Sequence, residues 1–306
     1  MADTAAKPPK KLGVLQNFAA SAIAACTAEV TTLPIDTAKV RLQLQGKAIA
    51  GEGGKLAELK YRGLLGTVGT VAKEEGVGAL WKGVVPGLHR QVLFGGLRIG
   101  LYEPVKNLYV GKDFQGDVPL IKKIAAGLTT GALGILVANP TDLVKVRLQA
   151  EGKLPPGVAK RYSGAMNAYA TIIKQEGVAK LWTGVGPNVA RNALINAAEL
   201  ASYDQVKQTL LKAGFQDNIG THIMSGLGAG FIAVCVGSPV DVVKSRVMGD
   251  ASGQYKGTID CFVKTFKSDG IGAFYKGFIP NFGRLGSWNV IMFLTLEQVK
   301  KLMAQQ

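Results

Sequence analysis

Long stretches of small and apolar residues alternate with short charged runs along this chain. The first stretch, AASAIAACTAEVTTLP at residues 19–34, leads directly into the charged run IDTAKVR at residues 35–41. Glycines recur inside such stretches, which soluble helices usually avoid but membrane helices use for close packing. An amphipathic segment, GLLGTVGTVAKEEG at residues 63–76, then precedes a second apolar stretch. The pattern predicts membrane-spanning helices linked by short surface helices.

The whole order of segments occurs three times, and such internal repetition decides the fold before any other feature. Four motifs mark each copy. The first is P-x-D-x-x-K-x-R, found as PIDTAKVR (34–41), PTDLVKVR (140–147) and PVDVVKSR (239–246). The second and third are EGVGALWKG (75–83), EGVAKLWTG (176–184) and DGIGAFYKG (269–277), then PGLHR (86–90), PNVAR (187–191) and PNFGR (280–284). The fourth is YEPVK (102–106), YDQVK (203–207) and LEQVK (296–300).

These repeats predict an all-α membrane protein with two membrane helices and one short surface helix in each copy. We expect repeats of about 100 residues at 12–110, 117–213 and 216–303, six membrane helices in all, and a disordered basic tail at 1–11. The proline of the first motif lacks an amide hydrogen, so it should kink the first membrane helix of each repeat.

The charges of the first motif share one helix face, because the acid and the lysine are three residues apart. Unpaired charges are costly in lipid, so each aspartate should meet the lysine of a neighbouring repeat. The predicted pairs are Asp36–Lys145, Asp142–Lys244 and Asp241–Lys39. The fourth motifs should close the other side through Glu103–Lys207, Asp204–Lys300 and Glu297–Lys106. If both rings are wetted, each pair contributes only about 0–1 kcal/mol and breaks reversibly, as alternating access requires. The alternative is that these charges reach toward lipid headgroups as helix ends.

Composition narrows the class of protein. The chain has 306 residues, is 47% hydrophobic and carries a net charge of +15, which suggests an anionic solute or anionic lipid as partner. Nucleic-acid motifs are absent, and the three cysteines have neither metal-ligand spacing nor the even number of a disulfide framework. No hydrolase, metalloprotease or Walker motif occurs. We therefore expect neither an enzyme nor a bound metal or cofactor.

The four motifs, over residues 12–303, resemble those of the mitochondrial carrier family. The resemblance implies a six-helix pseudo-threefold barrel in the mitochondrial inner membrane, working as a monomer, with its three surface helices on the matrix side. It also implies that the P-x-D motifs form a matrix gate and the Y-E/D-x-x-K motifs a cytoplasmic gate. In the family a glutamine braces the matrix gate; Gln43 and Gln149 match, whereas Met248 does not. A tyrosine braces the other gate; Tyr102 and Tyr203 match, whereas Leu296 does not.

Two further features follow from the resemblance. The family binds cardiolipin at glycine-bearing motifs, for which Gly63, Gly83, Gly184 and Gly277 are the candidates; helix N-termini favour phosphate for physical reasons as well. Stretches such as LPIDTAKVRLQ, LRIGLYEPVK and INAAELASYDQVK are similar to uncoupling proteins, with plant members as the nearest match. Those proteins dissipate the proton gradient, are activated by fatty acids and are inhibited by purine nucleotides.

The threefold symmetry supplies the gates, so substrate selectivity is expected where that symmetry breaks. Arg90, Arg191 and Arg284 occupy equivalent positions and match the family's contact points; deep arginines favour an anion. Asn192 after Arg191 goes, in the family, with carboxylate and keto-acid substrates. Ideal helical stepping does not place Arg90 on the face of Glu103 and Lys106, so the cavity location rests on the resemblance. The alternative is that the arginines brace the helices.

Other positions break the symmetry. Arg98, Glu199 and Met292 are equivalent to one another, so Arg98 and Glu199 could pair or bind a zwitterion, and Trp288 stands against Phe94 and Ile195. Glu29 lies seven residues before Asp36, and its equivalents are Ile135 and Val234. As an isolated acid facing the cavity, Glu29 is a candidate proton carrier beside Glu199; a hydrogen-bonded structural role is the alternative.

Two functions remain open from the sequence. One is fatty-acid-activated, purine-nucleotide-inhibited proton leak. The other is exchange of dicarboxylates and acidic amino acids such as aspartate, glutamate, malate and oxaloacetate, with a coupled proton. The arginines favour anions in both cases and do not discriminate between them.

Overall fold

The computed structural model describes residues 14–45, 60–111, 120–152, 160–216, 218–250 and 253–304, which are helical with short connections and contain no strand. The expected tail at 1–11 lies outside these residues. The same order of a long helix, a short helix, a 3₁₀ turn and a second long helix occurs three times. The first copy is α1 (Val14–Leu44), α2 (Gly63–Glu75), η1 (Val77–Trp81) and α3 (Val84–Val110). The second is α4 (Leu120–Ala150), α5 (Ala165–Glu176), η2 (Val178–Trp182) and α6 (Val185–Lys212), and the third is α7 (Ile219–Gly249), α8 (Thr258–Asp269), η3 (Ile271–Tyr275) and α9 (Phe278–Ala304).

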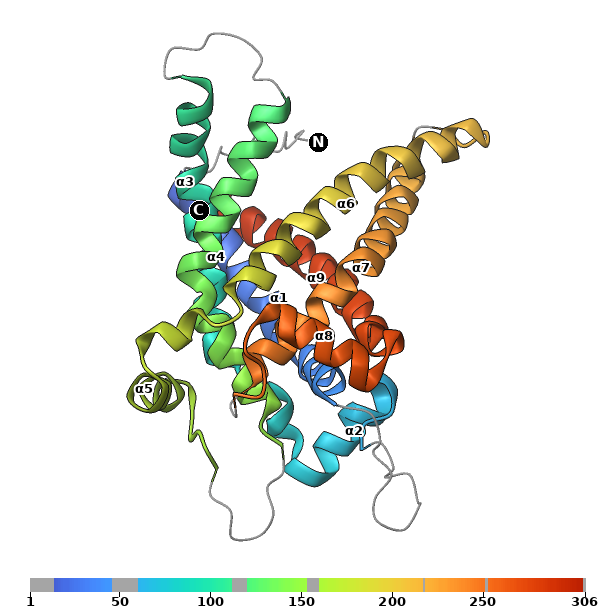
Figure 1. Cartoon of the computed structure of the whole chain (residues 1–306). Helices are drawn as coiled ribbons and strands as arrows, with labels where there is room; N and C mark the ends of the chain where they lie inside the picture. The colour runs from blue at the N-terminus through green and yellow to red at the C-terminus, as the bar shows by residue number, and fades with distance from the viewer. Residues whose placement is uncertain are drawn as a thin grey trace, which may run out of the picture.

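The long helices pack most extensively across the boundaries between repeats. The second long helix of each repeat lies against the first of the next, as α3 with α4, α6 with α7, and α9 with α1. Figure 1 shows these pairs diverging toward one end of the molecule, while α2 and α5 lie toward the other.

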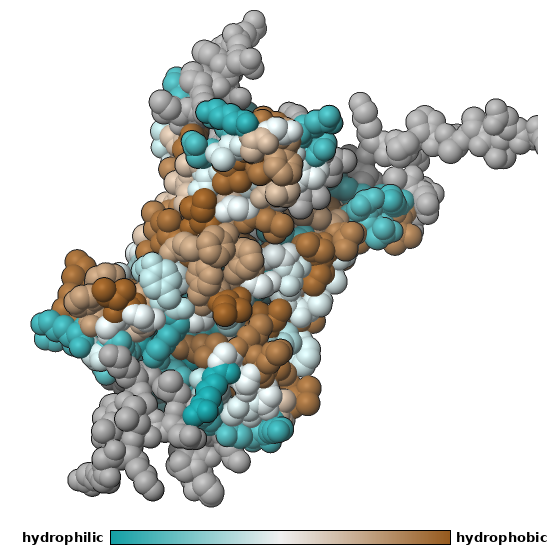
Figure 2. Space-filling model, turned by 90° about the vertical axis from the view of Figure 1, so that its right-hand side faces the viewer, coloured by the Kyte–Doolittle hydropathy of each residue, from teal (hydrophilic) through white to brown (hydrophobic). Residues whose placement is uncertain are grey.

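Three of the helices are long and apolar enough to cross a membrane: α1, α4 and α7. The partner helices α3, α6 and α9 have 27, 28 and 27 residues, a length that spans the hydrocarbon core of a bilayer, but they carry more charge. In the face shown in Figure 2, hydrophobic residues form a broad band across the middle and hydrophilic residues gather toward the ends.

A proline lies inside each of α1, α4 and α7, as expected, and removes one helical hydrogen bond. The carbonyl freed by Pro34 is that of Val30, and Trp81 donates its indole N–H to this oxygen at 3.0 Å. Trp182 does the same at 2.8 Å for Leu136, the carbonyl freed by Pro140. In these two repeats, the tryptophan of the second motif therefore donates a hydrogen bond to the carbonyl that the proline of the first motif leaves free. In the third repeat this place is taken by Tyr275, which has no N–H on its ring.

A glycine directly precedes the second long helix of each repeat. Gly83 precedes α3 with φ of +87°, where an L-residue is strained. A Cβ at Gly83 would also lie 3.2 Å from the carbonyl oxygen of Lys145. A larger residue would therefore push α3 away from the charged end of α4.

Candidate functional site

The charged residues of the P-x-D motifs meet at the centre of the molecule. We call Asp36, Asp142 and Asp241 the motif aspartates, and Lys39, Lys145 and Lys244 the motif lysines. The three pairs expected from the sequence are present: Lys145 Nζ lies 2.5 Å from Asp36 Oδ2, and Lys244 and Lys39 each lie 3.2 Å from Asp142 and Asp241. These pairs close a ring that links all three repeats.

The ring is buried, which corrects the expectation of wetted pairs. The motif aspartates are only 2–6% exposed. A buried ion pair offsets a large desolvation cost, and removal of one partner destabilises a protein by about 3–5 kcal/mol because the other charge is left uncompensated. Removal of one partner of these pairs should therefore cost more than removal of one partner of a surface pair.

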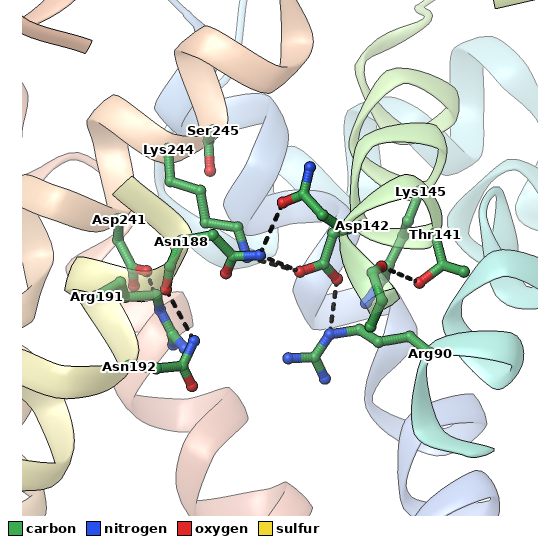
Figure 3. Close-up of polar contacts among 12 residues, drawn as sticks. Arg90, Thr141, Asp142, Lys145, Asn188, Arg191, Asn192, Asp241, Lys244 and Ser245 are labelled. Atoms are coloured by element: carbon green, nitrogen blue, oxygen red, sulfur yellow. Dashed lines mark hydrogen bonds and ion pairs between the residues drawn. The ribbon is translucent and has the colours of Figure 1, made fainter. Parts of the chain in front are cut away.

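The arginines of the third motif also reach the ring. We call Arg90, Arg191 and Arg284 the cavity arginines. Arg90 Nε lies 2.6 Å from Asp142 Oδ1, Arg284 Nε lies 3.0 Å from Asp36 Oδ1, and Arg191 pairs with Asp241. Figure 3 shows Arg90, Asn188 and Lys244 converging on Asp142. Each motif aspartate thus takes its lysine from the following repeat and its arginine from the preceding one.

The glutamines expected to brace the ring behave differently from each other. Gln149 donates its amide to Asp36 Oδ2 and to Thr37 Oγ1, both at 3.3 Å. Gln43 instead accepts a hydrogen bond from Ser245 at 2.6 Å, and its buried amide nitrogen has no partner among the described residues. The third position is Met248, which packs in an apolar cluster with Leu143 and Val144. Only the first of these matches the expected brace.

A second ring of contacts was missed by the sequence reasoning. The last residue of each P-x-D motif is an arginine that pairs with the acid opening the second motif. Arg41 binds Glu75 through two hydrogen bonds of 3.0 and 3.1 Å, and Arg147 binds Glu176 through two of 2.5 and 2.9 Å. Arg246 pairs with Asp269 at 2.5 Å. Threefold recurrence of both charges was the signal that could have revealed these pairs.

The same arginines cross to the next repeat. Arg41 donates to the carbonyl oxygen of Gln149, Arg147 to that of Met248 at 3.3 Å, and Arg246 to that of Gln43 at 3.2 Å. Each guanidinium therefore joins a surface helix, its own long helix and the neighbouring long helix. The sequence does not reveal these partners, because every residue has a backbone carbonyl.

The acids of this second ring lie outside the membrane-spanning segments. Hydrogen bonds from Arg147 hold the pKa of Glu176 below its ordinary value. Burial by itself would raise the pKa of Glu75, but Lys82 and Arg41 outweigh it and the pKa is lowered. Both carboxylates are consequently charged at neutral pH.

A cavity of about 940 Å³ lies next to the ring. All three cavity arginines line it, together with the expected Asn192, Glu199 and Trp288. Arg90 lies on this wall, which ideal helical stepping could not establish. Trp288 has a buried indole N–H without a partner among the described residues. Phe18, Ala22 and Ala25 of α1 form a less polar part of the wall.

The structure places Glu29 at the ring, so it is not the isolated acid that was expected. Glu29 is 1% exposed, and its carboxylate lies 2.5 Å from Lys145 Nζ and 3.4 Å from Arg284. Gln91 also donates to it at 2.8 Å. Its predicted equivalents Ile135 and Val234 are buried apolar residues.

The ring and Glu29 together carry an excess of positive charge. Three motif lysines and three cavity arginines face three motif aspartates and one glutamate, so the formal balance is +2. In a low-dielectric setting such an excess attracts an anion strongly.

The expected cytoplasmic ring is described only in part. The side chains of Arg98, Glu103 and Asp204 lie outside the described residues. Glu297 pairs with Lys301, one turn later on α9, at 2.7 Å, instead of with Lys106. Lys106 lies over the ring of Tyr102, a residue that lines the cavity. The buried ring thus stands at one end of the cavity, while Glu297 and Lys301 at the other side are more than half exposed.

The glycines expected to bind lipid all stand at helix starts. Gly63 is the first residue of α2, and Gly83, Gly184 and Gly277 directly precede α3, α6 and α9. All four have positive φ. Lipid binding there remains a prediction.

Comparison with known proteins agrees with the repeats. The model of the mitochondrial carrier protein family matches residues 10–113, 116–214 and 215–306. The chain is 78% identical to mitochondrial uncoupling protein 1 of Arabidopsis thaliana over 291 residues, which cover 95% of this chain and 94% of that protein. It is 64% identical to mitochondrial uncoupling protein 2 of the same plant, covering 98% and 97% of the two chains.

A more distant relative carries a different description. The chain is 47% identical over 288 residues to a Danio rerio protein called dicarboxylate carrier UCP2, with 94% and 91% of the two chains covered. Three consecutive family matches span nearly the whole sequence. The chain therefore belongs to the mitochondrial carrier family and is a multi-pass protein of the mitochondrial inner membrane.

Proposed function

We propose that this chain is an uncoupling carrier, which dissipates the proton gradient across the inner membrane by alternating access. The names of its plant relatives support the assignment. The observation that carries it is a cavity of about 940 Å³ that ends on a buried ring with an excess charge of +2. The six long helices cross the membrane, the ring is the matrix gate, and the fourth motifs form the cytoplasmic gate.

In this proposal the cavity arginines bind the carboxylate of a fatty acid as activator or the phosphates of a purine nucleotide as inhibitor. Both ligands are anions, and the guanidinium fork suits carboxylate and phosphate oxygens. Arg90 and Arg284 each turn Nε toward a motif aspartate, Asp142 and Asp36. Arg284 Nη2 also lies 3.4 Å from Glu29, so the terminal nitrogens of Arg90 are the first candidates for holding an anion. Glu29 and Glu199 are the candidates for carrying the proton, and cardiolipin binds at the four helix-start glycines.

A second function, exchange of dicarboxylates or acidic amino acids, is favoured by the magnitude of the excess charge. A formal +2 is matched by one dianion such as malate or oxaloacetate. Asn192 and Asn196 line the same cavity and supply amide groups that can hydrogen-bond a carboxylate or a hydroxyl. Transport requires no covalent chemistry from the chain.

The test uses the purified chain in liposomes. Proton flux is measured with and without fatty acid and GDP, in parallel with uptake of labelled malate and aspartate. We expect proton flux that depends on fatty acid and falls with GDP, and a loss of more than about tenfold in Arg90→Ala, equivalent to about 1.4 kcal/mol. Lys264→Ala, at an exposed ion pair on α8, is the control.

The possible outcomes separate the two functions. Anion exchange that is lost in Arg90→Ala, without fatty-acid-dependent proton flux, would replace uncoupling by exchange. Absence of both activities in an intact, folded sample would reject the proposed function. GDP-sensitive proton flux without anion uptake would assign the arginines to activator and inhibitor binding.

A further inference from the structure

Each motif aspartate faces its motif lysine with its Oδ2 atom and accepts a hydrogen bond from one side-chain amide at the same atom. The amide–aspartate pairs are Gln149–Asp36 at 3.3 Å, Asn188–Asp142 at 2.8 Å and Asn281–Asp241 at 2.8 Å. The two asparagines belong to the third motif, where the first repeat has Gly87. The first corner therefore takes its amide from a glutamine brace, and the other two take it from an asparagine.

Gln43 is a spare amide at the third corner. It holds the same position as Gln149, two residues after the motif arginine, but Asn281 already supplies the amide at Asp241. Gln43 is 1% exposed, and its amide nitrogen has no partner among the described residues. A buried donor without a partner is destabilising, so a role in another state of the gate would explain why it is there.

Ser245 holds Gln43 in this place. The Ser245 hydroxyl donates to Gln43 Oε1 at 2.6 Å. The equivalent residues of the first two repeats are Val40 and Val146, so only the third repeat has a hydroxyl at this position. Because Oε1 and Nε2 belong to one amide group, the bond to Ser245 fixes the orientation of the unpartnered nitrogen.

The spare amide lies one helical turn from Asp241. Lys39 and Gln43 are four residues apart on α1, and Asp241 and Ser245 are four residues apart on α7, so each pair shares a helix face. Lys39 contacts Asp241 at 3.2 Å, and Gln43 contacts Ser245. At the first junction, the equivalent glutamine does reach its aspartate. A rotation of the Gln43 side chain can therefore carry its amide to Asp241.

Asn281 differs from Asn188 because it faces the cavity. Asn281 and Arg191 both line the cavity and both hold Asp241, whereas Asn188 is not among the described residues that line it. An amide N–H beside a guanidinium is a pair of donors that suits a carboxylate or phosphate. An anion in the cavity can therefore draw Asn281 away from Asp241, which then lacks one donor.

We propose that Asn281 is a ligand-binding residue shared between the cavity and the matrix gate, and that Gln43 replaces it on Asp241 when an anion takes it. The proposal rests on the proposed function, because it takes the cavity as the anion site. The ligand is a carboxylate or phosphate anion that accepts a hydrogen bond from the Asn281 amide.

The exchange is favourable at the gate. Gln43 gives up its bond with the Ser245 hydroxyl and gains one with a charged acceptor, which is the stronger kind of hydrogen bond. While the cavity is empty, Asn281 and Lys39 occupy Asp241 Oδ2 and keep Gln43 on Ser245. The aspartate is thus satisfied whether or not the cavity holds an anion.

The first test removes the two amides in the absence of any ligand. Asn281→Ala, Gln43→Met and the double variant are purified, and their unfolding temperatures are measured in detergent. We expect each single variant to lose about 2 °C or less, because one amide remains for Asp241. The double variant should lose about 6 °C or more, because no amide remains. Losses that simply add would overturn the exchange.

The second corner is the matched control, because Met248 stands there in place of a spare glutamine. Asn188→Ala alone should lower the unfolding temperature by about 4 °C, and adding Met248→Gln should recover at least half of this loss. Asn188 also donates to Asn139, so the recovery is the decisive measurement. A lack of recovery would overturn the proposal, because a glutamine at this position could then not replace the asparagine.

The second test measures ligand binding. Malate and GDP are titrated against each protein, and the apparent Kd is obtained from the rise in unfolding temperature with ligand concentration. Asn281→Ala should raise the apparent Kd about tenfold for at least one probe. Gln43→Met should raise it about threefold, although Gln43 is not among the described residues that line the cavity. Asn188→Ala should raise it less than either. An unchanged apparent Kd in Asn281→Ala would overturn its ligand-binding role.

The two tests keep this proposal distinct from the proposed function. A wild-type chain that binds neither malate nor GDP and moves neither anions nor protons would reject the proposed function, and with it the ligand-binding role of Asn281. The stability measurements use no ligand, so they would still decide whether Gln43 replaces Asn281 on Asp241.

Discussion

Each motif aspartate holds two cations from two different repeats. Asp36, for example, contacts Lys145 of the second repeat and Arg284 of the third. The lysine partners were predictable because charge and spacing repeat three times in the sequence. The arginine partners were not, because ideal helical periodicity does not place Arg90 on the face of the charged motifs.

Glu176 offers a test of the second ring at the level of one residue. Its folded-state pKa lies below its ordinary value of 4.5 because Arg147 donates to it. A depressed pKa stabilises the fold above the ordinary value, and this contribution is lost as pH falls through the folded-state value. Glu176→Gln should therefore be less stable than wild type at pH 7, and the difference should shrink below pH of about 4.5.

Thermal unfolding in detergent across this pH range checks the prediction. Glu74→Gln is a matched control, because Glu74 pairs with Lys60 at the surface with more than a third of both side chains exposed. Surface pairs contribute about 0–1 kcal/mol. A constant difference between Glu176→Gln and wild type at every pH would contradict the assignment.

At the scale of elements, the long helices were expected from hydrophobic patterning, and they are present. Pro34, Pro140 and Pro239 lie inside three of these helices; the kinks expected from them remain a prediction. What the pattern could not show is the partner of each freed carbonyl. Trp81 and Trp182 supply it from η1 and η2, since tertiary packing brings these turns against α1 and α4.

Trp81→Phe should keep the ring and remove the indole N–H that serves the Val30 carbonyl. A lost hydrogen bond of this kind costs about 1 kcal/mol, and we expect a decrease of about 2 °C in the unfolding temperature. Trp182→Phe should behave similarly. Tyr275→Phe is the control, because Tyr275 has no such N–H. An equal loss in Tyr275→Phe would show that the indole bond is not the cause.

At the scale of the whole molecule, the three junctions between repeats are unequal. The first has the brace from Gln149 and a bond from Lys82 to the carbonyl of Glu151 at 3.0 Å. At the third junction, Lys276 Nζ donates a hydrogen bond to the carbonyl oxygen of Gln45 at 2.9 Å. At the second junction these positions are Met248 and Thr183. Met248 packs in an apolar cluster, and threonine is too short to replace the lysine contact.

Met248→Gln should strengthen this second junction by restoring an amide next to Asp142 and Lys244. A gain of about 1 kcal/mol should raise the unfolding temperature by about 2 °C and slow transport about fivefold, because the closed matrix gate becomes harder to open. Met248→Leu, which keeps the apolar packing, is the control. The prediction fails if Met248→Gln transports as fast as Met248→Leu.

The sequence by itself determined the threefold order of elements, the helical class, the prolines inside the first long helix of each repeat and the lysine–aspartate ring. These features repeat, and repetition makes local patterns and charge spacing unambiguous. Tertiary structure alone decided the arginine–aspartate pairs, the carbonyl partners of Trp81 and Arg41, and the place of Glu29 beside Gly87. These depend on contacts between residues far apart in the chain. The partners of Arg41 and Trp81 are backbone carbonyls, and Glu29 fits because Gly87 has no side chain.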